Sequence, residues 1–124
     1  MTPDERDEAS ETERTPRRDE LEERIAAFAE MVREDPADPV AQFSYGQALL
    51  ARSRFAEAAT AFEAVIALSP NYSAAYRGLG RALEALDRRD DARAAYTRGI
   101  DVACAAGDLQ TKKEMEVFLT RMRS

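Results

Sequence analysis

The chain has 124 residues, of which 44% are hydrophobic and 34% charged, and its formal net charge at pH 7 is −6. This length suits one domain with a modest core. The longest apolar runs, 64–68 and 102–106, are far shorter than the roughly 18 residues of a membrane-spanning helix. The acidic beginning lacks the apolar stretch of a secretory signal, and the charge lacks the basic excess that nucleic-acid binding requires. We therefore expect a cytoplasmic protein that binds neither membranes nor nucleic acid.

The sequence offers no clear catalytic or metal-binding group. It contains no histidine, which is the commonest general base and metal ligand. The single cysteine, Cys104, stands among alanines and valine, where we expect a small buried thiol without an activating partner. The glycines are too scattered to form a phosphate-binding loop. We therefore expect no catalytic residue, no metal and no cofactor, and predict that the protein is not an enzyme.

The first part of the chain, residues 1–18, is predicted to be a disordered tail. It contains two prolines but no aromatic and no branched aliphatic residue, so it cannot bury enough surface to offset the entropy of ordering. Its charge is strongly acidic, because residues 1–20 hold eight acids and four arginines. The tail is either a charged interaction arm or an unstructured terminus without a role.

A single domain is predicted from residue 19 to residue 124, and it begins with a helix over 19–36. Leu21, Ile25, Phe28 and Val32 fall on one face of this helix, at spacings of four, three and four. Asp35-Pro36 then ends it, since proline is tolerated in the first turn of a helix but not inside one.

Residues 39–72 and 73–106 repeat one pattern at an offset of 34 residues. Each copy has helical apolar spacing in two segments, which predicts helices near 38–51, 54–68, 72–85 and 88–104. The small residues at matching positions are expected where two helices approach closely. At the same offset, 19–36 aligns with the second half of a copy, so it is predicted to be a half repeat. The matching pairs include Gly46 and Gly80, Leu49 and Leu83, Ala58 and Ala92, and Phe62 and Tyr96.

The last segment is predicted to be a capping helix over 108–122. Gly107 stops the preceding helix, and Asp108 can accept hydrogen bonds from the free N–H groups of the next. The apolar residues of this segment, Met115 and Phe118 among them, share one face. The helix is therefore expected to close the end of the stack.

With its repeated residues, the chain resembles the tetratricopeptide repeat family, and the small bacterial members in particular. The residues that carry the resemblance are Tyr45, Gly46, Leu49, Ala58, Phe62 and Pro70 in the first copy, and Tyr76, Leu79, Gly80, Leu83, Ala92 and Tyr96 in the second. Gln42 departs from the pattern, which predicts a less well anchored start of its helix, and Cys104 stands where a closing proline is usual. The resemblance implies an all-α superhelix, a helix-turn-helix solenoid of about six helices that ends in a C-terminal capping helix.

The resemblance also implies a partner-binding surface on the concave side of the superhelix. The partner would be a protein or peptide. Arg77 and Arg81 lie one turn apart on the same helix and favour a partner that is acidic or ends in a free carboxylate. The alternative is that these arginines are ordinary solvated helix residues that pair with Glu84 and neighbouring acids. Phe43 is either a partner anchor or packed against the N-terminal helix, and we favour packing. The residues expected on this surface are Phe43, Gln47, Arg77, Arg81 and Lys112.

A different class of function is also open. The half repeat leaves apolar surface on its helix, so the protein could instead be a structural unit that forms a homodimer through this helix or through the groove.

Overall fold

A computed structural model describes residues 17–123 as a stack of helices, with no strand among these residues. The predicted all-α fold of a helical repeat protein is confirmed. Residues 1–16, which make up most of the predicted tail, and Ser124 lie outside the described residues. The six described helices, in chain order, are α2 (Arg18–Glu34), α3 (Pro39–Ala51), α4 (Phe55–Leu68), α5 (Ser73–Ala85), α6 (Arg89–Ala106) and α7 (Leu109–Arg121).

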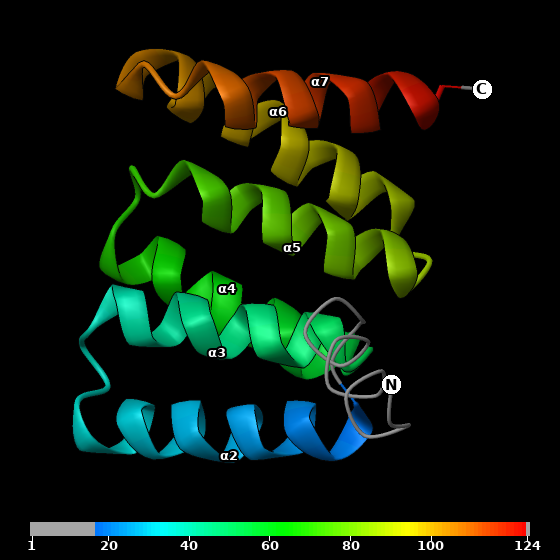
Figure 1. The fold of residues 1–124 in the computed structure, drawn as a ribbon. Helices are drawn as coiled ribbons and strands as arrows, with labels where there is room; N and C mark the ends of the chain where they lie inside the picture. Colours follow the sequence, from blue (N-terminus) through cyan, green and yellow to red (C-terminus); the bar gives the residue numbers. More distant parts are fainter. Residues whose placement is uncertain (1–16, 124) are drawn as a thin grey trace, which may run out of the picture.

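The helices form two layers (Figure 1). Helices α3, α5 and α7 lie side by side in one layer, with contacts between α3 and α5 and between α5 and α7. Helices α4 and α6 lie behind them, and α2 packs below α3 at one end of the stack. Every helix also packs on its neighbours in the sequence, as expected of a repeat array. Among the described helices, none is long and apolar enough to cross a membrane.

Short turns reverse the chain within each complete repeat. Ser53 and Asp87 occupy equivalent places in these turns and adopt left-handed φ angles of 64° and 59°. Gly107 does the same between α6 and α7, with φ 74°, because glycine enters this region without a Cβ clash. The turns are only a few residues long, so the helices that they join run antiparallel (Figure 1).

The core is built where aromatic rings lie directly on helix backbones. Phe62 is fully buried, and a Cβ added at Gly46 would lie 2.9 Å from its Cε1 atom. A Cβ at Gly78 would lie 2.5 Å from the Cζ atom of the same ring. Tyr96 is equally buried and sits on Gly80 in the same way. The repeated glycines therefore let α4 and α6 approach the first-layer helices closely.

Gln42 and Tyr76 stand at the same repeat position and make the same kind of contact. The hydroxyl of Tyr76 donates a hydrogen bond of 2.8 Å to the carbonyl of Pro70. The side-chain amide of Gln42 donates to the carbonyl of Pro36 at 3.4 Å. The start of α3 is thus anchored as in the next repeat, although by a longer bond.

Asp108 joins the capping helix to the last complete repeat. Its carboxylate accepts hydrogen bonds from the backbone N–H of Thr111, at 3.2 Å, and from the hydroxyl of Ser73, at 2.6 Å. These bonds, with that from Ser73 the stronger cause, lower the pKa of Asp108 below its usual value. One carboxylate therefore caps α7 and holds it against the start of α5.

The prediction of a buried thiol at Cys104 is wrong. Cys104 is exposed, whereas its neighbour Ala103 is fully buried. Helix α6 continues to Ala106, and its rotation turns residue 103 toward the core, so residue 104 faces solvent.

Candidate functional site

A charged hollow of the first layer lies between α5 and α7. It has a volume of about 400 Å³. The guanidinium of Arg81, from α5, lies 5.9 Å from the centre of the Phe118 ring, and that of Arg121 lies 5.5 Å from the same ring. Two cations from two helices thus converge on one aromatic side chain of α7. The hollow, called here the arginine hollow, is lined by Arg81, Glu84, Ala85, Phe118 and Arg121.

The back of the arginine hollow is fixed by Tyr96. Its ring centre lies 5.5 Å from that of Phe118, and its hydroxyl donates a hydrogen bond of 2.5 Å to Glu84. Burial, helped by this hydrogen bond, raises the pKa of Tyr96 well above its usual range. The hydroxyl therefore stays protonated and keeps the Glu84 carboxylate engaged, while the two guanidiniums make the hollow net positive.

The structure does not bring Arg77, Arg81 and Lys112 together. Arg77 forms an ion pair of 3.1 Å with Glu114 across α5 and α7. Lys112 lies 3.5 Å from Glu116 on its own helix. Arg77 and Lys112 are therefore engaged with acids, and Arg81 meets Arg121 instead of either of them.

Arg121 is the residue that sequence reasoning missed. The sequence feature that points to Arg121 is its spacing of three residues from Phe118, which places both side chains on one side of a helix. Recognising the site also required the pairing of α7 with α5, because Arg81 and Arg121 are 40 positions apart in the sequence. Glu84 accepts the Tyr96 hydroxyl, and Arg77 pairs with another acid, Glu114, which is the kind of pairing that the alternative interpretation expects for Arg77.

Phe43, on the first-layer helix α3, packs against two aromatic rings. Its ring centre lies 4.9 Å from that of Tyr72 and 5.8 Å from that of Phe62. Its aromatic contacts are therefore with α4 and with the segment before α5.

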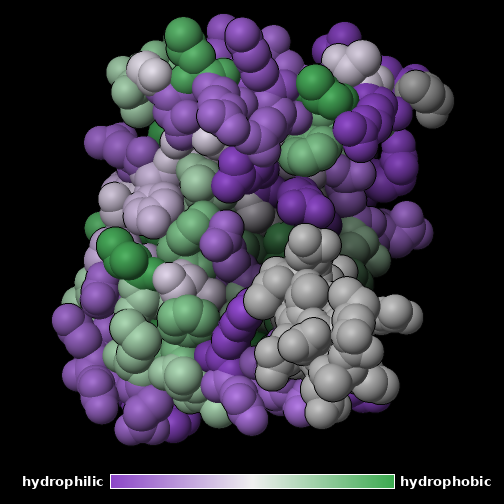
Figure 2. Space-filling view, in the orientation of Figure 1, coloured by the Kyte–Doolittle hydropathy of each residue, from purple (hydrophilic) through white to green (hydrophobic). Residues whose placement is uncertain are grey.

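Figure 2 shows the face of the molecule that is seen in Figure 1. Hydrophobic side chains gather there around the level of α3, and hydrophilic ones dominate over α7. The face is thus apolar in its middle and charged toward the capping helix.

Gln47 is exposed and lies in a second hollow, between α2 and α3. This hollow has a volume of about 320 Å³. It is called here the α2–α3 slot and is lined by Leu21, Arg24, Phe28, Ser44, Gln47, Ala48 and Ala51. Gln47 is therefore remote from the arginine hollow, at the opposite end of the stack (Figure 1).

Within the described range 17–123, no group of three or more histidine, cysteine, aspartate and glutamate side chains is placed to hold a metal ion. The arginine hollow has no nucleophile beside a base. What it can do is hold an anion by charge and by the N–H edges of two guanidiniums.

Comparison with known proteins gives one consistent family. The model of the tetratricopeptide repeat matches residues 49–103. The chain is 30% identical over 98 residues to the TPR repeat-containing protein PA0015 of Pseudomonas aeruginosa, which covers 79% of this chain and 93% of that protein.

Solved structures agree with this match. The protein BPP2914 from Bordetella parapertussis superposes with a TM-score of 0.70 at 28% identity, covering 80% of this chain and 86% of that one. The crystal structure of a tetratricopeptide repeat domain protein from Salinibacter ruber superposes with a TM-score of 0.65 at 30% identity, covering 69% of this chain and 96% of that one.

Proposed function

Because the chain belongs to the tetratricopeptide repeat family, whose fold generally mediates contacts between proteins, we propose that it binds an acidic segment of another protein in the arginine hollow. The module is non-catalytic, and the bound group is a carboxylate, from an acidic side chain or a free C-terminus. The observation that carries the proposal is the convergence of Arg81 and Arg121 on Phe118.

The geometry favours a carboxylate over other ligands. A guanidinium that stacks on an aromatic ring keeps the N–H groups at its edge free to donate, and two such groups match the two oxygens of a carboxylate. The hollow is partly walled by α5 and α7, which reduces screening by water compared with an open surface. The one acid in the lining, Glu84, accepts the Tyr96 hydroxyl and offsets only part of the charge of the two arginines.

The test is fluorescence anisotropy with a labelled peptide of alanine and glutamate residues that ends in a free carboxylate. The double variant Arg81→Glu with Arg121→Glu should weaken its binding about tenfold or more, since loss of charge-assisted hydrogen bonds costs at least this factor. Raising the salt from about 50 to about 500 mM should also weaken binding to the native chain.

The matched control is the double variant Arg33→Glu with Arg93→Glu, which makes the same change of charge on α2 and α6. Both arginines make exposed ion pairs within one helix, with Glu30 and Asp90. Arg89 is unsuitable as a control, because its guanidinium donates to the carbonyl of Met122 at the end of α7. Equal binding by both double variants would contradict the proposal. A comparison of the free with the amidated C-terminus, with and without glutamate in the peptide, tells which of the two carboxylates is bound.

A further inference from the structure

The α2–α3 slot has the form of a missing helix. Phe28 stands one repeat offset before Phe62 and two before Tyr96. Those two rings are 0% exposed, since a first-layer helix covers each of them. Phe28 is only partly buried, because α2 has no first-layer helix before it in the described part of the chain. Phe28 therefore lines an open slot where the complete repeats have a packed helix.

The turn before the second helix of each complete repeat has no counterpart at the start of α2 among the described residues. The reversals of the complete repeats pass through Ser53 and Asp87 in left-handed conformations. The equivalent position in the half repeat is Asp19, which lies inside α2. Helix α2 begins at Arg18, three positions earlier than its repeat equivalents at Phe55 and Arg89. The turn that would place a preceding helix in the slot is thus replaced by helix.

We propose that a second copy of this chain fills the slot, with its own α2 antiparallel to the first. The first helix of each complete repeat runs antiparallel to the second (Figure 1), and two identical helices related by a perpendicular two-fold axis are also antiparallel. Helix α2 has 17 residues and the first-layer helices α3 and α5 have 13, so a second α2 is long enough for the place. Each copy thereby supplies the missing helix of the other.

The exposed stripe of α2 is complementary to itself in this arrangement. The stripe consists of Leu21, Arg24, Phe28 and Met31, which share one side of the helix. In an antiparallel pair centred near residue 26, Leu21 faces Met31 of the second copy. Arg24 faces Phe28 of the second copy. Because of the two-fold symmetry, the pair makes two apolar contacts between Leu21 and Met31 and two contacts between the Arg24 cation and the Phe28 ring.

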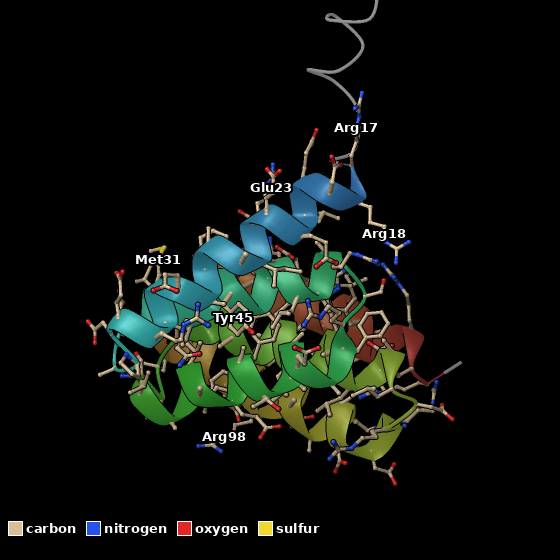
Figure 3. The ribbon with its side chains drawn as sticks, turned by 90° about the horizontal axis from the view of Figure 1, so that it is seen from below. Arg17, Arg18, Glu23, Met31, Tyr45 and Arg98 are labelled. Atoms are coloured by element: carbon tan, nitrogen blue, oxygen red, sulfur yellow. The ribbon has the colours of Figure 1, made fainter. Side chains whose placement is uncertain are left out.

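The described residues support both contacts. Met31 is 46% exposed and projects from α2 into solvent (Figure 3). Arg24 has no ion-pair partner among them. The same chain places an arginine over Tyr76 at 5.6 Å and two over Phe118, so an arginine on an aromatic ring is a contact it uses repeatedly. Phe28 lacks this cover in a single copy.

Charge gives the dimer a salt dependence of its own. Helix α2 carries six acids and three arginines, so two copies of it repel each other at low salt. Screening weakens that repulsion. Dimer formation should therefore strengthen from about 50 to about 500 mM salt, whereas binding of an acidic peptide in the arginine hollow should weaken. The two sites lie at opposite ends of the stack, so the dimer does not depend on the proposed function.

The test is sedimentation equilibrium of the full-length chain and two variants. Met31→Glu should raise the dissociation constant of the dimer about tenfold or more, because it puts a charge against Leu21 of the second copy. Val117→Glu is the matched control, since Val117 is 48% exposed and lies on α7, at the other end of the stack. A chain that stays monomeric at high micromolar concentration, or a dimer that only Val117→Glu weakens, overturns the proposal.

Cross-linking tests the antiparallel direction and the occupant together. In a Cys104→Ser background, the Leu21→Cys and Met31→Cys variants are mixed and oxidised. A mixed disulfide dimer should form at least tenfold faster than the Met31→Cys variant cross-links with itself. Preferential self-linking of Met31→Cys would indicate a parallel pair. Absence of the mixed dimer would show that another segment fills the slot, and either result overturns the proposal.

Discussion

The complete repeats and the half repeat place the same kind of side chain in different surroundings. Phe62 and Tyr96 lie between two first-layer helices and are shielded from water. Phe28, at the equivalent position, is partly buried against the core cluster and borders the slot. The difference shows that the helices on both sides of a side chain, and not its residue type, determine how far it is buried in a repeat protein. Stability should therefore decrease from the middle of the stack toward α2.

The largest expected effect compares two phenylalanines. Phe62→Ala should lower the free energy of unfolding by about 3 to 5 kcal/mol, because it leaves a cavity between α3, α4 and α5. Phe28→Ala should cost about 1 to 2 kcal/mol, since part of the ring is already exposed. Urea unfolding at low micromolar protein measures both. Equal losses would show that α2 is packed as tightly as α4.

The second comparison concerns the close approach of helix backbones. Gly80→Ala should destabilise the protein by about 2 kcal/mol, because the new methyl overlaps the Tyr96 ring, which burial and the bond to Glu84 hold in place. Ser44→Ala, at the edge of the slot, should change stability by less than about 0.5 kcal/mol. Thermal unfolding followed by circular dichroism distinguishes them. A stabilised Gly80→Ala variant would mean that helix propensity outweighs the clash.

The third prediction concerns the opposite end of the stack, where Asp108 anchors α7. Asp108→Ala should cost about 1 kcal/mol at pH 7, through the lost cap and the lost bond from Ser73. The pKa of Asp108 is lower in the folded state, so its contribution is present above the unfolded value, about 3.9. It is lost as the pH falls through the folded pKa. Unfolding measured from pH 7 to pH 2 should therefore show the two proteins converging in acid, and a constant difference would contradict this account.

The smallest expected effect is at Arg24. The complete repeats have fully buried alanines, Ala58 and Ala92, at its position, but Arg24 faces the open slot. Arg24→Ala should therefore change the stability of the monomer by less than about 0.5 kcal/mol. Its effect should appear instead in the dissociation constant of the dimer. A large loss of stability in dilute protein would show that Arg24 supports the fold itself.

Much of the fold could be predicted from the sequence because the interactions that form it are local or repeated. The 34-residue offset fixed Gly46 with Gly80 and Phe62 with Tyr96, and the structure places each aromatic ring on its glycine. The candidate site was predicted only in part. Arg81 was identified from its place on a first-layer helix, but its companion Arg121 was not, because α7 departs from the repeat and its facing residues cannot be aligned by the offset.

The amino-acid sequence by itself determined the helices and their repeat, since spacing and turn residues act within a few positions of the chain. Only the tertiary structure decided which charges meet. It paired Arg77 with Glu114, joined Arg81 to Arg121 over Phe118, and left Arg24 in the open slot. Contacts between helices depend on their rotation and separation in space, and these are set by the packing of the whole stack.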